Sequence, residues 1–167
     1  PRHRTHHDPS GIVAATSIPM IPPFANIRPL DLAVEEAGTE QLLTKVMGFL
    51  QSFTWARQSG GVWVGVSIPD VIGVFLVGLE GSSEDIDPHI WVVVGDIPPA
   101  YISSEYAKTP KEAVEGYIDE MEAWIDAVEN DKPLDEVIPV DAAPTLENAS
   151  ALRSRLSFMR EKILPIL

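Results

Sequence analysis

The sequence predicts an α+β domain in which one helix precedes, and two helices follow, a three-stranded antiparallel meander (α-β-β-β-α-α). Two observations predict this class. Three long segments repeat apolar residues at three- and four-residue steps, as a buried helix face does. Between the first two of them lie three short runs rich in Val, Ile, Phe and Trp, which are typical of strands.

The N-terminal residues 1–29 are predicted to form a proline-rich arm, poorly ordered or peripheral to the domain. They hold six of the fifteen prolines and show no sustained apolar period. Residues 30–167 are then long enough for a single α+β domain with one core.

The first helix is predicted over residues 39–58, with Gly60 and Gly61 ending it. Strands are predicted over residues 62–68, 71–79 and 90–94, with a turn at Pro69-Asp70 and a polar loop over 80–88. Because no helix separates these strands, an antiparallel meander is the simplest topology. Pro98 and Pro99 are expected to prevent further pairing, and the helices are expected on one face or one end of the sheet.

The second helix is predicted over residues 109–131, where Thr109 and Glu112 have the spacing of a capping box and Pro110 suits the first helical position. The third is predicted over residues 145–164. Its inward face is expected to comprise Leu146, Ala149, Leu152, Leu156, Met159 and Ile163.

A row of carboxylates accompanies the apolar face of the second helix. Its members recur at three- and four-residue steps, which places them on one stripe: Glu112, Glu115, Asp119, Glu122, Asp126 and Glu129. One interpretation is a solvated face that packing elsewhere tolerates. The other is a docking surface for a basic protein partner.

Charge and composition exclude several classes of function. The net charge is −13, and residues 80–141 alone hold 17 Asp or Glu against three lysines, which disfavours nucleic-acid binding. No apolar run is long enough to span a membrane, so we expect a cytoplasmic protein that does not bind membranes. The absence of cysteine excludes a thiol nucleophile and cysteine-ligated zinc or iron–sulfur sites.

Candidate catalytic and metal sites are few, and the sequence predicts no catalytic residue, metal or cofactor. His3, His6, His7 and Asp8 carry ligand atoms, but they lie in the proline-rich arm, without rigid partners to orient them. The acidic loop 84–87 lacks the spacing of a calcium loop. Only His89 remains in the body of the chain, where a surface or packing role is expected, and no nucleophile elbow is present. A non-enzymatic role is favoured.

Trp91, Asp96 and Tyr101 form an alternative candidate site. Aromatic walls with a few convergent polar groups are typical of small-molecule pockets, and these residues cluster at the end of the third predicted strand. Asp96 has a second interpretation, in which it simply bonds the backbone of the following turn.

The segment 91–103, WVVVGDIPPAYIS, is followed by Thr-Pro-Lys-Glu-Ala at 109–113 and by Trp124. These residues resemble a small bacterial family of uncharacterised proteins, whose members carry a tryptophan-rich strand that leads into Gly-Asp-Leu-Pro and a Pro-x-Glu-Ala helix start. The resemblance covers about the second half of the chain, including a loose similarity of residues 152–164 to the terminal helix. The tryptophan- and cysteine-containing N-terminal region of that family has no counterpart here. The resemblance implies a bacterial protein of this fold and no catalytic residue.

These observations lead to two hypotheses from different classes. The first is a non-catalytic bacterial protein-binding module, such as an immunity or antitoxin-like inhibitor, whose acidic surface docks a basic partner. The second is a small-molecule-binding or enzymatic domain with a pocket near Trp91, Asp96 and Tyr101. A homodimer formed through a helix face or an open sheet edge is a third possibility.

Overall fold

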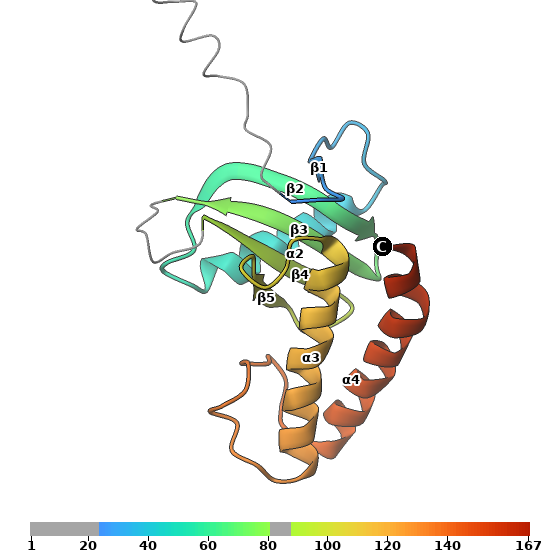
Figure 1. Ribbon diagram of the computed structural model, residues 1–167. Helices are drawn as coiled ribbons and strands as arrows, with labels where there is room; N and C mark the ends of the chain where they lie inside the picture. The colour runs from blue at the N-terminus through green and yellow to red at the C-terminus, as the bar shows by residue number, and fades with distance from the viewer. Residues whose placement is uncertain (1–23, 81–87) are drawn as a thin grey trace, which may run out of the picture.

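The computed structural model describes residues 24–80 and 88–167, which form a five-stranded antiparallel sheet and three α-helices (Figure 1). The α+β class is therefore confirmed, whereas the predicted number of three strands is wrong. In this part of the chain, no helix is long and apolar enough to cross a membrane.

The sheet is an uninterrupted meander in which each strand pairs with its neighbours in the sequence. Its order is β1-β2-β3-β4-β5, and every pair is antiparallel. The strands are β1 (Arg28–Pro29), β2 (Gln58–Ile68), β3 (Ile72–Leu79), β4 (His89–Gly95) and β5 (Ala100–Ser103). The predicted meander over the three long strands is thus present, and a short strand extends it on each side.

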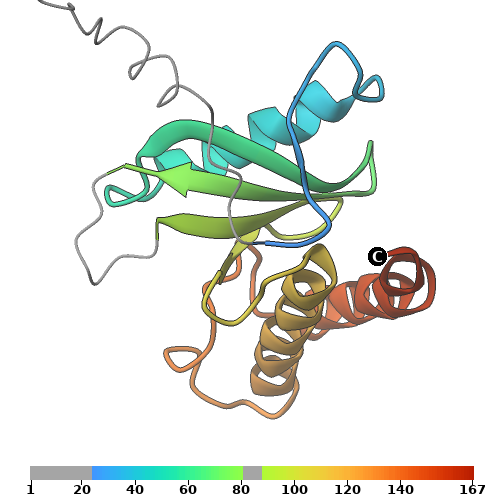
Figure 2. The same cartoon turned by 45° about the horizontal axis from the view of Figure 1, so that its top comes forward.

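The helices cover both faces of the sheet, contrary to the prediction that they lie on one face or end. Helix α2 (Thr39–Gln51) packs on one face, while α3 (Pro110–Glu129) and α4 (Leu146–Phe158) pack on the other (Figure 2). The reason is visible in β3, whose eight residues are all buried: Phe75 and Val77 face α2, whereas Val74 and Leu76 face α3. A continuous apolar strand is typical of a sheet whose two faces are both covered by other elements.

Helix α2 ends at Gln51, seven residues before the predicted end near residue 58. Ser52 closes it, because both its backbone N–H and its hydroxyl donate to the carbonyl of Phe49, at 3.2 and 2.6 Å. Phe53 continues the helical apolar period in the sequence and its ring contacts that of Phe49, but it lies beyond the end of the helix and also contacts Trp55 and Tyr101. The chain then enters β2 at Gln58, so Gly60 and Gly61 lie within a strand.

Strand β5 follows directly after Pro99, although the two prolines were expected to prevent pairing. They lie in the turn between β4 and β5, where no ladder N–H is required. Gly95 starts this turn with a φ of 142°, and a Cβ there would lie 2.2 Å from the carbonyl oxygen of Val71. Only glycine fits at this position, and pairing resumes at Ala100, opposite Val93.

Strand β1 forms the opposite edge of the sheet and lies at the end of the segment 1–29 predicted as an arm. Arg28 pairs with Val64 and Pro29 with Trp63, and both β1 residues are exposed. A proline is tolerated here because an edge strand has one side without partners.

Helices α3 and α4 pack against each other, and α3 contacts β3, β4 and β5 on the second face of the sheet. Thr109 caps α3 as predicted, since its hydroxyl accepts from the Glu112 N–H at 3.1 Å; the Glu112 carboxylate accepts from the N–H of Lys108. Helix α4 continues through a π-helical turn, η1 (Met159–Ile163), into a 3-10 turn, η2 (Leu164–Ile166). Leu146, predicted to face inward, is 66% exposed, because it lies in the first turn of α4, beyond the covered face.

Candidate functional site

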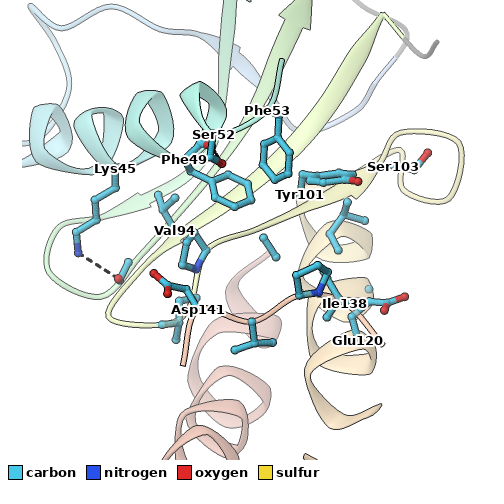
Figure 3. A pocket seen from close by; sticks show the side chains of 18 of the residues that line it. Lys45, Phe49, Ser52, Phe53, Val94, Tyr101, Ser103, Glu120, Ile138 and Asp141 are labelled. Carbon is cyan, nitrogen blue, oxygen red and sulfur yellow. Dashed lines mark hydrogen bonds between the residues drawn. The ribbon is translucent and has the colours of Figure 1, made fainter. Parts of the chain in front are cut away.

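A groove of about 1270 Å³ runs along β5, between α2 and α3 (Figure 3). We call it the β5 groove. Phe49, Ser52 and Phe53 form the wall on the α2 side. Gly116, Asp119 and Glu120 of α3 form the opposite wall, together with residues 138–141 of the connection between α3 and α4. All four residues of β5 line its floor.

The α2 side of the groove is aromatic. The ring of Phe53 lies 5.1 Å from that of Phe49 and 5.5 Å from that of Tyr101, and Trp55 lies 5.2 Å from Tyr101, in mostly edge-to-face contacts. Tyr101 and Trp55 remain 37% and 38% exposed, and Tyr106, at the end of the groove, is 83% exposed. Aromatic side chains left in water beside a groove favour a binding surface, because such residues contribute large contact areas with little loss of entropy.

Gly116 allows α3 to lie close to β5. A Cβ at this position would lie 3.2 Å from Cγ2 of Ile102, which is tighter than an ordinary contact. A glycine inside a helix destabilises it by roughly 1 kcal/mol relative to alanine. The close approach of helix and strand explains why it occurs here, and it leaves the groove wall low beside β5.

The α3 side of the groove is acidic. Asp119, Glu120 and Asp141 line it with exposed side chains, and within residues 24–80 and 88–167 no ion pair reaches any of them. Lys45 is the one basic side chain among the lining residues, and its Nζ donates to the carbonyl of Gly95 at 3.1 Å. The groove therefore carries a net negative charge on one wall.

The predicted acidic stripe is divided by the ion pairs of the chain itself. Its second half is matched by basic residues: Glu122 pairs with Arg160, Asp126 with Lys132 and Glu129 with Arg153. The Lys132 ammonium, hydrogen-bonded to Asp126 at 2.6 Å, lowers the pKa of that carboxyl. In the first half, Glu112 belongs to the helix cap, and Glu115 and Asp119 are exposed without an ion pair among the described residues.

Of the stripe, only Asp119 lines the β5 groove. Glu120 and Asp141 were not predicted as site residues, because Glu120 lies beside the stripe and Asp141 lies in a connection without periodicity. The fold brings residues 116–120 and 138–141 to the same groove, although they are far apart in the sequence.

The predicted ligand residues Trp91, Asp96 and Tyr101 do not converge. Trp91 and Tyr101 lie on neighbouring strands, but they face opposite sides of the sheet. Trp91 is fully buried, and its indole N–H donates to the carbonyl of Ala107 at 2.8 Å. Only Tyr101 lines the β5 groove.

Asp96 instead connects the β4–β5 turn to α4. Its backbone carbonyl accepts from Nε of Arg155 at 2.7 Å, and its exposed carboxylate lies 3.4 Å from the same guanidinium. It borders a separate hollow of about 420 Å³ on the α4 side. An anchoring contact with α4 therefore accounts for this aspartate, in place of the predicted bond to its own turn.

Potential metal-ligating side chains lie dispersed in the part of the chain that the structure describes. No three His, Cys, Asp or Glu side chains of residues 24–80 and 88–167 are grouped so as to hold a metal ion. The ring of His89 lies 5.7 Å from those of Phe24 and Trp63. The histidines of the N-terminal arm and the acidic loop 84–87 lie outside the described residues.

Comparison of the chain with protein-family models, with curated proteins and with solved structures finds no match. The resemblance of residues 91–124 to a bacterial family therefore remains an expectation from the sequence. Any function has to be argued from the groove and its charges.

Proposed function

We propose that this chain is a non-catalytic protein-binding module whose β5 groove takes an apolar and basic segment of a partner protein. The observation that carries the proposal is the pairing of a partly exposed aromatic wall, formed by Phe49, Phe53 and Tyr101, with carboxylates that have no ion pair among the described residues. Burial of apolar area gives affinity, and unpaired charge selects the sign of the partner.

The charge of the whole chain supports the same partner. At −13, the protein attracts basic molecules over a distance, which raises their rate of association at low ionic strength. In the groove, the carboxylates of Asp119, Glu120 and Asp141 are available to a basic partner. The carboxylates in the second half of the α3 stripe already form ion pairs with Arg153, Arg160 and Lys132. An inhibitor of the immunity or antitoxin kind, acting on a basic bacterial protein in the cytoplasm, is the biological form that we propose.

The test uses a fluorescently labelled peptide of about nine residues that contains only valine and lysine, enough to extend beyond both ends of β5. We expect it to bind at low salt and to lose most of its affinity between about 50 and 500 mM salt, because screening removes the charge contribution. Fluorescence anisotropy measures the dissociation constant of the peptide at each salt concentration.

The triple variant Asp119→Asn, Glu120→Gln, Asp141→Asn should weaken this binding at low salt by about ten- to a hundredfold and reduce its dependence on salt. A matched control is Asp131→Asn, Asp135→Asn, Glu136→Gln. It removes the same number of charges from exposed positions that do not line the groove. Equal weakening by the two triple variants would show that the net charge alone, and not the groove, attracts the peptide.

The aromatic wall supplies a second, independent test. Tyr101→Ala should weaken peptide binding at every salt concentration, since it removes apolar contact and not charge. Phe158→Ala on α4 is the control, because Phe158 is also exposed but does not line the groove.

A small molecule is the alternative occupant that the aromatic contacts favour. A compound with one aromatic ring and one cationic group would place the ring against Phe53 and Tyr101 and the charge near the acidic wall. If such a compound stabilises the protein in a thermal-shift assay and the peptide does not bind, the groove is a small-molecule site and the proposal is overturned.

A further inference from the structure

We infer that the partner segment binds in an extended form as an additional strand beside β5, with apolar and basic side chains alternating along it. This inference rests on the proposed function, because it specifies how the β5 groove holds its partner. It assigns a binding mode, a sequence pattern and a set of backbone hydrogen bonds.

Within the described part of the chain, no strand pairs with the outer edge of β5. Strand β5 is last in the sheet and pairs only with β4, from Ala100 opposite Val93 to Ser103 opposite Ile90. Among the described residues, no other backbone group bonds to Ala100, Tyr101 or Ile102, and the carbonyl of Ser103 accepts from the N–H groups of Tyr106 and Ala107. In an antiparallel sheet, every second residue of an edge strand directs its N–H and C=O outward, where another strand can bond to them.

The groove runs along this free edge. Its lining includes every residue of β5, and it is bounded by α2 on one side of the sheet and by α3 with residues 138–141 on the other (Figure 3). A strand placed in this groove would therefore meet β5 with its backbone and the two walls with its side chains. Other domains bind peptides in this way, with affinity from main-chain bonds and specificity from the walls.

The two walls differ in chemistry, and this difference predicts the pattern of the added strand. Tyr101 points to the α2 side, where it meets Phe53, whereas Ala100 and Ile102 point to the core on the α3 side. Successive side chains of an added strand alternate in the same way. One set would contact the aromatic wall, and the other set would approach Asp119, Glu120 and Asp141.

The occupant to which these features point is an extended segment of a basic protein, with apolar residues at every second position and Lys or Arg between them. Charge selects it over an acidic or purely apolar strand, because the carboxylates of the groove have no ion pair among the described residues. Strand β5 has four residues, so the paired part of the segment spans about 13 Å, with further contacts beyond its ends.

The experiment compares peptides of about nine residues that have one composition and different arrangements. The first alternates valine and lysine, and the second places the valines in one block and the lysines in another. We expect the alternating peptide to bind the full chain at least about tenfold more tightly, because only its arrangement matches both walls. Equal affinities would overturn the predicted pattern while leaving the proposed function intact.

A second pair of peptides tests the backbone bonds directly. Both keep the alternating sequence, but backbone N-methyl groups stand at every second residue, on one edge of the extended peptide or on the other. Methyl groups on the edge that faces β5 remove its hydrogen bonds and should weaken binding at least about tenfold, whereas methyl groups on the outer edge should have a small effect. If both methylated peptides bind like the parent, strand addition is excluded.

Amide hydrogen exchange of the protein gives an independent measure. Two alternating amides of Ala100–Ser103 should become protected when the alternating peptide binds, and the amide of Arg28 in β1 should not change. Peptide binding without protection in β5 would overturn the inference but not the proposed function, whereas no binding at low salt would overturn both. Protection that instead grows with protein concentration, together with a dimer in light scattering, would identify a second copy of the chain as the occupant and overturn the inference.

Discussion

At the scale of single residues, Tyr117 shows how a polar group is placed in this core. Its side chain is fully buried on α3, and its hydroxyl donates to the carbonyl of Pro98 at 2.6 Å. Burial raises the pKa of Tyr117, because the phenolate would lie away from water. The bond joins α3 to the turn that leads into β5, so it also supports one end of the β5 groove.

The variant Tyr117→Phe should therefore lower the free energy of unfolding by about 1–2 kcal/mol near pH 8, since the Pro98 carbonyl loses its donor. The contribution of the tyrosine is complete below about pH 10 and is lost above it, because the unfolded chain releases the proton that the folded chain retains. The difference between the two proteins should then shrink by about 1.4 kcal/mol per pH unit above 10. Urea unfolding of both proteins between about pH 8 and 11 measures this, and a constant difference would contradict it.

At the scale of elements, α4 contributes to the core through a narrow stripe. Ala149, Leu152 and Leu156 are buried against α3 and the sheet, whereas Leu146 and Phe158 at the two ends of the helix are exposed. The stability of the helix should thus depend on a few central positions.

Leu156→Ala should lower the free energy of unfolding by about 2–5 kcal/mol, because Leu156 is 1% exposed and its loss leaves a cavity. Leu146→Ala is the matched control in the same helix, and its effect should stay below about 0.5 kcal/mol. Chemical denaturation of the two variants tests the assignment of the helix face. A similar loss for both would mean that Leu146 is covered in solution.

The sequence predicts elements well where a local signal determines them. Helix α3 is one case, since the Thr109 cap, Pro110 and the apolar period all depend on neighbouring residues. The end of α2 is a case of the opposite kind. Phe53 fits the helical period and contacts Phe49, but α2 ends before it, and its ring also contacts Tyr101, nearly fifty residues away.

Strand β5 and the groove beside it lie beyond such local signals. A four-residue strand directly after Pro98 and Pro99 has no pattern that distinguishes it from a loop. The groove combines residues 45–53, 94–103, 116–120 and 138–141, and no spacing in the sequence relates these segments. Trp91 and Tyr101 were both predicted as ligand residues, yet the register of β4 and β5 places them on opposite sides of the sheet.

At the scale of the whole molecule, one sheet serves two cores. Leu42, Val46 and Leu50 of α2 pack on one face, and the side chains of α3 and α4 pack on the other. Since β3 contributes alternate residues to both, neither core can open without exposing this strand. We expect the two faces to unfold together.

Val46→Ala, on the α2 face, should therefore lower the stability of both faces equally, by roughly 2 kcal/mol. Far-UV circular dichroism follows the backbone. Tryptophan fluorescence follows the opposite face through Trp91 and Trp124, once the signal of Trp55 beside Tyr101 is removed by a Trp55→Phe background. The two signals should shift to the same new midpoint in urea. Separate transitions would show that the faces are independent.

The two-residue strand β1 has a consequence for self-assembly. Its Pro29 brings no backbone donor to that border of the sheet, and Arg28 adds a charge, whereas the border at β5 presents bonding groups. Molecules that join through their sheet margins need two competent ends to grow into a fibril. Among the described residues, β1 makes its border a poor end for such growth, so concentrated solutions should stay free of filaments in the electron microscope.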